Sequence, residues 1–445
     1  MKPFPEISLG YRMKLHHRKI SLAVVSMAAL AVALVLAVPG CNGGGGGTEA
    51  AVAGNRFGVY SPGSLAEVPT SAAAAMIGAL GLESLADYED YSLGIMTDLG
   101  VGWARIDFSF DGWRFHEPGH LEGMRLLGIQ VVGTARPVNN FAPGDLSRFQ
   151  EELRRLIHRY PWIRAWQIGN EPNVHWEPAD YARLFTAGQQ VVREECPDCL
   201  VLLAGVAARF PTPDDALAYY DDLLSSIQDD RAFDVFDMHY YGPSGADEEM
   251  LAALERYREL LAARGFGDST GFWVTETATT GGPVAPAGVP LQSEEQQAAE
   301  LVRRFTTMLA AGVDRVAWAR PYENYRYHGI ENGYYDHNAI IFNGLGAEAG
   351  MGVAAGATKQ AYRAYRALIG RVDGFSSAQR LSPGFYRFGF DDGRADVFVV
   401  WDAGSGALPD QLQGTVLVTD LEGEQRRMDA GALEPGSVPV FVERV

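Results

Sequence analysis

From Phe57 to Ile369 the sequence repeats one unit eight times: a short run of β-branched and aromatic residues, then a stretch with apolar residues at helical spacing. This alternation is typical of βα units that build a parallel sheet. The predicted strands are Phe57–Tyr60, Trp103–Phe108, Gln130–Thr134, Ala165–Gly169, Leu200–Ala204, Phe233–His239, Phe272–Glu276 and Arg315–Ala319.

Eight βα units in about 310 residues favour a closed (β/α)8 TIM barrel over an open doubly wound sheet. No Gly-x-Gly-x-x-Gly follows the first strand, so a dinucleotide site is not indicated. The intervening stretches carry helix signals. Asp145 is placed to cap a helix that ends at Arg159, and Ser293 with Gln296 forms a capping-box pattern before a helix that Gly312 ends.

The pattern changes after a helix predicted over Thr358–Ile369. Short alternating segments separated by turn residues then predict a small antiparallel β-domain, with strands at Gly384–Phe390, Ala395–Trp401 and Thr415–Thr419. We therefore expect a signal or anchor segment over 1–40, a Gly-rich tether over 41–54, a catalytic barrel over 55–370 and a β-domain over 371–445.

The N-terminus has the order of an export signal, with basic residues at Lys14–Lys19 before an apolar run at Ile20–Val38. Pro39, Gly40 and Cys41 follow. This resembles a bacterial lipoprotein signal, which makes Cys41 a candidate for lipidation, although Pro39 departs from the usual residue. An uncleaved anchor helix is the alternative, because 19 apolar residues can span a bilayer. Both interpretations predict an exported protein held at the cell envelope by a flexible glycine tether.

The charge balance argues against two kinds of partner. The whole chain has a net charge of −19, and without the first 40 residues, which hold five Lys or Arg and one Glu, 32 basic and 55 acidic residues give −23. The part of the chain after residue 40 is therefore acidic enough to repel nucleic-acid phosphates and anionic lipid surfaces. We expect no nucleic-acid partner, membrane contact only through the N-terminal segment, and a neutral substrate rather than a polyanion.

Two cysteines remain, Cys196 and Cys199, in a Cys-x-x-Cys motif that can form a redox pair or half of a zinc site. No second Cys-x-x-Cys or His pair completes a metal set. The motif lies between a helix that ends near Arg193 and the strand Leu200–Ala204, on the face of the barrel away from the chemistry. We therefore predict a local disulfide formed in an oxidising compartment.

Two of the predicted strands lead into glutamates. The fourth strand runs into Asn170 and Glu171, and the seventh ends at Glu276. The carboxyl ends of the strands line the active face of such a barrel. Strands four and seven lie on opposite sides of the barrel mouth, so the two carboxyl groups can face each other across a bound substrate.

These motifs resemble those of clan A of the glycoside hydrolases over roughly residues 55–370. The match consists of the fourth-strand motif Trp166–Asn173 with the acid/base Glu171, the seventh-strand motif Trp273–Glu276 with the nucleophile Glu276, the sixth-strand His239-Tyr240-Tyr241, an arginine near the nucleophile at Arg105, and an eighth-strand Trp318 at the sugar-binding floor. With the C-terminal tail, it suggests relatives of the family that contains β-xylosidases and α-L-iduronidases.

The resemblance implies a retaining glycosidase that uses two glutamates in a double displacement and needs no metal or organic cofactor. Retaining enzymes hold their carboxyl groups about 5 to 5.5 Å apart. Glu171 must begin protonated, which we expect apolar surroundings and a negative neighbour to favour. Arg105 and Tyr241 are expected to favour the charged form of Glu276. Asn170 can donate to the sugar 2-hydroxyl.

Other interpretations remain open at this stage. Arg105 could pair with Asp107 instead, and His239 and Trp318 could be core residues. The function could be transglycosylation, or non-catalytic carbohydrate binding at a surface. Further candidates for substrate subsites in the loops after the strands are Trp113, Arg136, Trp176, Arg320 and the run from Tyr322 to Tyr325.

Overall fold

The computed structural model describes residues 54–60, 62, 74, 77–109, 118–137, 145–207, 213–227, 229, 231–267, 270–286, 288–324, 332–344, 353–402 and 412–445. The chain divides into two units, Met1–Gly45 and Gly46–Val445. The predicted signal, Cys41 and almost all of the predicted tether lie outside the described residues. Within the described ranges, no helix is both long and apolar enough to cross a membrane.

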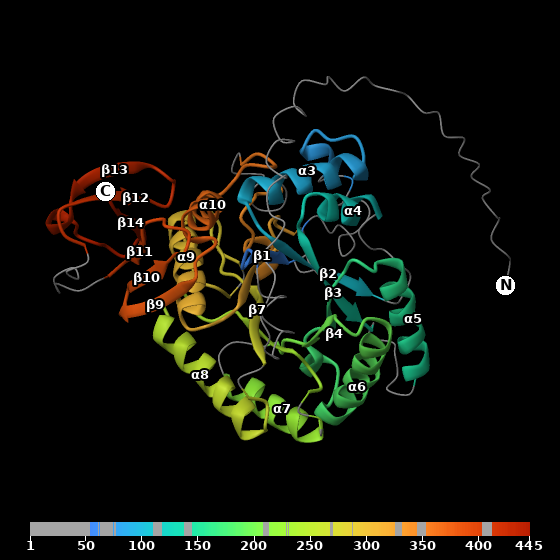
Figure 1. Cartoon of the computed structure of the whole chain (residues 1–445). Coiled ribbons are helices and arrows are strands. Elements are labelled where there is room, and N and C mark those ends of the chain that lie inside the picture. The colour runs from blue at the N-terminus through green and yellow to red at the C-terminus, as the bar shows by residue number, and fades with distance from the viewer. Residues whose placement is uncertain are drawn as a thin grey trace, which may run out of the picture. The chain divides into compact units, whose positions relative to one another are not determined.

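Eight parallel strands form a closed barrel, which confirms the predicted fold (Figure 1). Each strand pairs with the next, and β1 pairs with β8 to close the cylinder. The strands are β1 (Phe57–Tyr60), β2 (Trp103–Ser109), β3 (Gln130–Arg136), β4 (Ala165–Ile168), β5 (Leu200–Leu203), β6 (Val235–Tyr240), β7 (Gly271–Thr277) and β8 (Arg315–Ala319).

Helices surround the barrel, as Figure 1 shows for α5 to α9. They are α3 (Leu85–Leu99), α4 (Pro118–Leu126), α5 (Leu146–Arg159), α6 (Pro178–Glu195), α7 (Pro213–Ser226), α8 (Asp247–Ala263), α9 (Glu294–Ala310) and α10 (Gln360–Val372), with the short 3-10 helix η1 (Pro172–Val174) in the loop after β4.

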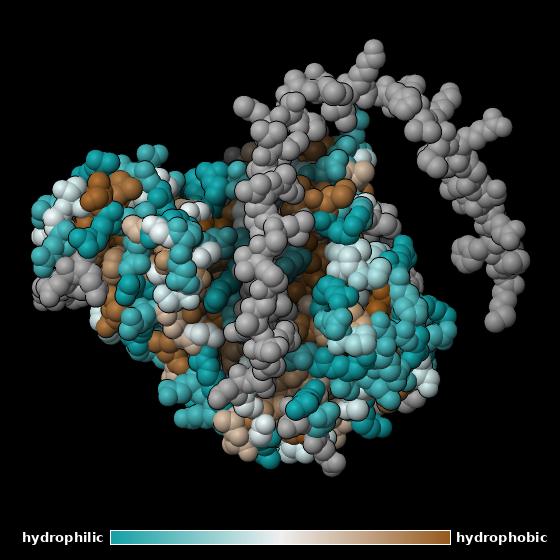
Figure 2. All heavy atoms as spheres, viewed as in Figure 1, coloured by the Kyte–Doolittle hydropathy of each residue, from teal (hydrophilic) through white to brown (hydrophobic). Residues whose placement is uncertain are grey.

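The predicted helix caps are confirmed. The Asp145 side chain accepts from the amide of Arg148 at the start of α5, and Ser293 and Gln296 form a capping box at the start of α9. Helix α5 buries Phe149 and Leu153 against the barrel, and Figure 2 shows hydrophilic residues over its outer side at the lower right. Helix α5 therefore packs an apolar face on the sheet and leaves a polar face to water.

A six-stranded antiparallel sheet follows the barrel, in the order β13-β12-β14-β11-β10-β9, which confirms the predicted C-terminal β-domain. It contacts the outer helices: the Thr307 hydroxyl of α9 donates to Tyr386 at 3.2 Å, and Arg371 of α10 pairs with Glu443 at 2.8 Å. Its strands are β9 (Ser377–Ser382), β10 (Phe385–Gly389), β11 (Val397–Val400), β12 (Thr415–Thr419), β13 (Gln425–Asp429) and β14 (Val440–Arg444).

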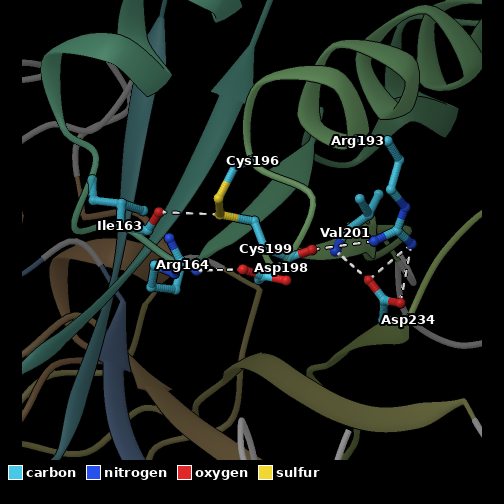
Figure 3. The surroundings of a disulfide bond; sticks show 8 residues. All are labelled: Ile163, Arg164, Arg193, Cys196, Asp198, Cys199, Val201 and Asp234. Atoms are coloured by element: carbon cyan, nitrogen blue, oxygen red, sulfur yellow. Dashed lines mark hydrogen bonds and ion pairs between the residues drawn. A yellow bond between two sulfur atoms is a disulfide. The ribbon is translucent and has the colours of Figure 1, made fainter. Parts of the chain in front are cut away.

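Cys196 and Cys199 are joined by a disulfide in the turn between α6 and β5, with their Cα atoms 5.3 Å apart (Figure 3). Around it, Arg193 donates to the Cys199 carbonyl and pairs with Asp234 at 3.0 Å. The turn lies at the N-terminal end of β5, whereas Glu171 follows the C-terminal end of β4 and Glu276 lies in the C-terminal part of β7. The bond therefore closes a turn at the opposite end of the barrel from the candidate site.

An apolar layer fills the part of the barrel interior nearer the N-terminal ends of the strands. Trp103 and Trp273 reach across it with ring centroids 5.9 Å apart, and both side chains are 0% exposed. The other members of this layer are Val132, Ala165, Leu200, Leu202, Val235 and Ala317. This packing closes the barrel below the site and leaves the C-terminal end for polar side chains.

We expect Trp103→Ala to lower the free energy of unfolding by about 3 to 5 kcal/mol, because it leaves a cavity in a close-packed layer. Urea denaturation would measure the change. Leu126→Ala is the control, since Leu126 is 74% exposed and its truncation should change stability by less than about 0.5 kcal/mol. A loss for Trp103→Ala no larger than the control's would contradict the close packing of this layer.

Candidate active site

The structure brings together six of the residues predicted for the site. Arg105 comes from β2, Asn170 and Glu171 from the end of β4, His239 and Tyr241 from β6 and the residue after it, and Glu276 from β7. One carboxylate oxygen of Glu171, one of Glu276 and a ring nitrogen of His239 all lie within 4.8 Å of one another. The two glutamates thus converge at one point on the C-terminal face of the barrel.

The Arg105 guanidinium lies at the centre of this group and is 0% exposed. It donates to Glu276 Oε1 at 2.6 Å, to Asn170 Oδ1 at 2.5 Å and to Thr134 Oγ1 at 2.9 Å. Burial alone would lower its pKa, but the negative charges of Glu276 and Asp107 outweigh that effect and raise the pKa. Arg105 is therefore a permanent cation that holds Glu276 and Asn170 in place.

Asp107 shares the charge of Arg105 but is not its main partner. The two side chains are 3.6 Å apart, compared with 2.6 Å between Arg105 and Glu276. Asp107 also accepts from the Tyr60 hydroxyl at 2.8 Å and from Arg136 at 3.1 Å. The alternative pairing considered from the sequence is thus present, as a secondary contact.

A closed ring of hydrogen bonds lies in the barrel interior beneath the glutamates. Arg105 donates to Thr134, Thr134 donates to Gln167 at 3.0 Å, and Gln167 donates to Asp237 at 2.5 Å. Thr275 completes the ring, since its hydroxyl donates to Asp237 at 2.7 Å and accepts from Arg105 at 3.1 Å. All five side chains are fully buried, so their orientation is set by one another and not by water.

The backbone of β7 is irregular where it carries Glu276. Asp237 of β6 pairs with Trp273, and His239 pairs with Glu276, so that three steps along β7 match two along β6. The register with β8 shifts in the same segment. This extra residue is a β-bulge, and it lets Thr275 and Glu276 both reach Arg105, although neighbours in a regular strand point to opposite faces.

Tyr241 holds the second oxygen of Glu276. Its hydroxyl donates to Oε2 at 2.7 Å. Burial and the charge of Glu276 raise the pKa of Tyr241, so its hydroxyl keeps the proton that it donates. With Arg105 on Oε1 and Tyr241 on Oε2, the carboxyl group of Glu276 is fixed from two sides.

Glu171 has an unusual backbone conformation, with a φ of 42° in the left-handed region. This conformation is strained for a residue that is not glycine, and more so before Pro172. The amide of Glu171 donates to the Gly205 carbonyl at 3.0 Å, and its own carbonyl accepts from Val174 at 3.1 Å. Strained residues of this kind are concentrated at functional sites, where the surrounding structure holds them.

His239 connects the two glutamates. Its Nδ1 lies 3.0 Å from Glu171 Oε1, and its Nε2 lies 3.2 Å from Arg105, 3.4 Å from Asp237 and 3.6 Å from Glu276. Burial opposes protonation of the ring, but the charge of Glu276 and the hydrogen bonds with Asp237 and Glu171 outweigh it and raise the pKa of His239 to about 10. His239 is therefore a cation at neutral pH and not a neutral core residue.

This cation corrects one expectation from the sequence. Apolar surroundings were expected to keep the proton on Glu171. Burial does favour the neutral carboxyl, but the hydrogen bond and charge of His239, with Arg105, outweigh burial and lower the pKa of Glu171. In the unliganded site the proton therefore lies on His239, within hydrogen-bond reach of Glu171.

Glu171, His239 and Glu276 are close enough to suggest a metal site. The surrounding charges argue against one. Arg105 donates to Glu276 at 2.6 Å, so a metal ion on Glu276 would lie beside a permanent cation. His239 would also have to lose the proton that its neighbours stabilise. The cluster is better suited to moving protons and binding a neutral ligand.

Other predicted site residues have different environments. Trp318 is 0% exposed and donates to the Asn338 carbonyl at 3.1 Å, so a sugar could stack on it only after the covering side chains move. Its place at a sugar-binding floor stays a prediction. Arg136 lies beside Asp107, and Glu323 is buried against Lys359 at 2.5 Å. Trp113 and Tyr325 lie outside the described residues.

The sequence reasoning missed Thr134, Gln167, Asp237 and Thr275, which form the ring with Arg105. The two-residue period of a strand offered a signal. Asp237 precedes His239 by two residues and so shares its face of β6. A polar residue at an inward position of a barrel strand could have identified this layer.

No protein-family model matches the sequence, and no curated protein matches it. Solved structures share the fold. A family 39 glycoside hydrolase from Bacteroides cellulosilyticus superposes with a TM-score of 0.61 at 15% identity, over 88% of this chain and 81% of that one. A glucosidase from Croceicoccus marinus gives 0.57 at 13%, over 88% and 97%. A family 51 α-L-arabinofuranosidase from Bifidobacterium longum gives 0.51 at 12%, over 79% and 87%.

Gly205 tests whether the position of His239 matters. A Cβ atom there would lie less than 3.0 Å from both His239 and Asp237. We expect Gly205→Ala to displace His239 and lower kcat/KM by about tenfold or more, because small misplacements at a site are costly. Steady-state kinetics would show this. Gly267→Ala is the control, since nothing lies within 4 Å of a Cβ there; equal activity of the two variants would contradict the expectation.

Proposed function

We propose that this protein is a retaining glycoside hydrolase, with Glu171 as the acid/base and Glu276 as the nucleophile. The observation that carries the proposal is that one carboxylate oxygen of Glu171 and one of Glu276 lie within 4.8 Å of each other at the C-terminal end of a closed barrel. Retaining enzymes need a separation of about 5 to 5.5 Å, whereas inverting enzymes leave about 6.5 to 9.5 Å for a water molecule. The short spacing supports direct attack by a carboxylate.

Three further features support the proposal. The motifs around Glu171 and Glu276 resemble those of clan A. The barrel superposes on solved structures described as glycoside hydrolases, which supports the fold such enzymes use. Arg105 and Tyr241 contact Glu276 as the resemblance implies. Within clan A we propose a relative of the family that contains β-xylosidases and α-L-iduronidases, because a small β-domain follows the barrel.

The first step forms a covalent intermediate. Glu276 attacks the anomeric carbon, the bond from that carbon to the leaving oxygen breaks, and Glu171 gives its proton to that oxygen. Arg105 and Tyr241 fix the attacking carboxylate. Asn170 accepts from Arg105 through Oδ1, which leaves its Nδ2 group to donate to the sugar 2-hydroxyl. That contact strengthens in the transition state.

The second step releases the sugar. Glu171, now ionised, takes a proton from water, the water oxygen attacks the anomeric carbon, and the ester bond to Glu276 breaks. His239 stabilises the ionised form of Glu171 that this step requires. For the first step, the proton in the His239–Glu171 hydrogen bond has to move onto Glu171 when substrate binds.

Transglycosylation is a second candidate, because a sugar hydroxyl can take the place of water in the second step. Products analysed at high acceptor concentration would distinguish the two reactions.

We also propose that the protein is exported and held at the cell envelope through Cys41 or an uncleaved N-terminal anchor. The Cys196–Cys199 disulfide supports an oxidising compartment.

Replacing each glutamate tests the proposed function. We expect Glu171→Gln to lower kcat/KM for a glycoside with a poor leaving group by about a hundredfold to ten-thousandfold, because general acid catalysis is lost. Glu276→Gln removes the nucleophile and should lower it at least as far. Activity would be assayed on a panel of nitrophenyl glycosides and natural oligosaccharides. Glu151→Gln is the control, since that side chain is 62% exposed on α5. Full activity in either site variant would refute the assignment.

The pH dependence tests His239. The hydrogen bond and charge of His239 lower the pKa of Glu171, whereas burial alone would raise it. His239 carries this charge at pH values below its own pKa of about 10. Removing the hydrogen bond and charge in His239→Asn should raise the pKa of Glu171. In the free enzyme the proton that the first step uses lies on His239, so the alkaline limb of kcat/KM reports its loss with a pKa of about 10. In His239→Asn this proton lies on Glu171 alone, a carboxyl group that loses it at lower pH than His239 does, so the alkaline limb should move to lower pH.

His158→Asn is the control for this experiment, because His158 is 61% exposed on α5, and it should leave the profile unchanged. An alkaline limb that stays in place or moves to higher pH in His239→Asn would contradict the expectation. It would mean that the proton for the first step does not lie on His239 in the free enzyme.

A further inference from the structure

A cavity of about 930 Å³ lies beside the candidate site, between the loops that follow β6 and β7 and the C-terminal sheet. Its lining includes Tyr241, whose hydroxyl donates to Glu276 at 2.7 Å. Ser437 and Val438 of the C-terminal domain line it as well. Tyr241 therefore contacts the proposed nucleophile and also lines the cavity, and both domains contribute to its lining.

Part of the lining is apolar. Val289, Pro290, Leu291 and Val438 line the cavity together with the Tyr334 ring, which packs edge-on against Tyr241 at 6.0 Å. Leu291 is 59% exposed. A single exposed leucine needs no explanation, but one that borders a cavity with other apolar side chains provides a surface for a ligand. Aromatic and aliphatic surfaces of this kind suit the C–H faces of sugar rings.

The cavity also has polar groups with unused hydrogen-bonding capacity. Gln292 Oε1 accepts from Ser244 at 2.9 Å and from Thr279 at 3.1 Å, which fixes the amide. In the described part of the chain nothing accepts from Gln292 Nε2, and no side chain donates to the exposed Glu295 carboxylate. A fixed donor and a free acceptor beside an apolar surface match sugar hydroxyls, which both donate and accept.

The charges lining the cavity favour a neutral ligand. Glu300 is compensated, because it pairs with Arg304 at 2.7 Å and accepts from the Gly245 amide at 2.8 Å. Arg303 pairs with Asp402 at 2.7 Å. Glu295 is left as a carboxylate without a cation among the described residues, and it would repel an acidic sugar.

We propose that this cavity binds an additional sugar residue of a neutral oligosaccharide whose scissile bond lies between Glu171 and Glu276. The proposal rests on the proposed function and extends it to the substrate class. Its consequence is that the C-terminal domain takes part in substrate recognition through Ser437 and Val438.

Chain-length dependence tests the proposal. The probes are an aryl monoglycoside that the wild-type protein hydrolyses and the trisaccharide of the same sugar. Leu291→Ala removes part of the apolar surface, and Ser437→Trp narrows the cavity from the C-terminal domain. We expect each variant to lower the ratio of kcat/KM for the trisaccharide to kcat/KM for the monoglycoside by about fivefold or more. Leu126→Ala, at an exposed leucine away from the cavity, should leave the ratio unchanged.

An unchanged ratio in both variants would overturn the proposal and leave the proposed function standing. The ratio is unchanged also when kcat/KM falls equally for both probes. A fall confined to aryl glycosides with large apolar aglycones would also overturn it, because the cavity would then bind the aglycone. If the wild-type protein cleaved no glycoside at all, the proposed function would fail, and this extension of it would fail too.

Discussion

The buried guanidinium of Arg105 is the constraint on which the rest of the site depends. A cation with no exposure to water is costly unless acceptors surround it. At the barrel mouth, Glu276 and Asn170 accept hydrogen bonds from Arg105. In the barrel interior, Thr134 and Thr275 accept them. Three strands (β2, β3 and β7) and the loop after β4 must therefore present polar side chains to one point. The contacts that offset the cost of burying the Arg105 charge also position the Glu276 carboxylate, which is proposed to attack the sugar.

The barrel is regular, and the departures from regularity lie where its strands end. β7 has an extra residue that directs Thr275 and Glu276 to the same side. Glu171 and Arg320, after β4 and β8, have positive φ values of 42° and 69°. Conformations of this kind cost on the order of 1 to 3 kcal/mol each and persist only where other contacts determine them. The packed interior around Trp103 supplies the rigid frame that holds such strain at the active face.

Periodicity in the sequence predicted the barrel well, because its strands are largely apolar runs and helices α5 and α9 have clear N-terminal cap signals. The predicted bounds of β1 and β8 match the structure to the residue, and those of the other barrel strands differ at their ends by one or two residues.

The features that the sequence predicted poorly have physical reasons. β9 and β13 are polar edge strands with no buried face to reveal them. The bulge in β7 depends on how this strand pairs with β6 and β8, and the His239–Glu171 contact joins residues 68 positions apart. Because both features depend on distant parts of the chain, no short stretch of sequence indicates either of them. The effect of His239 on Glu171 was missed for that reason, whereas Glu171, Glu276, Arg105 and Tyr241 were found through their motifs.

The central claim is that Glu276 forms a covalent bond to the sugar that Glu171 protonates. Incubation with an activated 2-fluoro glycoside, followed by peptide mass spectrometry, tests it directly. The fluorine slows both formation and hydrolysis of the covalent intermediate, and the activated leaving group keeps formation fast enough for the intermediate to accumulate. The glycosyl group should be found on the peptide that contains Glu276, and Glu276→Gln should not be labelled. Labelling of any other residue, or turnover of a glycoside without a trapped intermediate and with inverted configuration in the product, would contradict the claim.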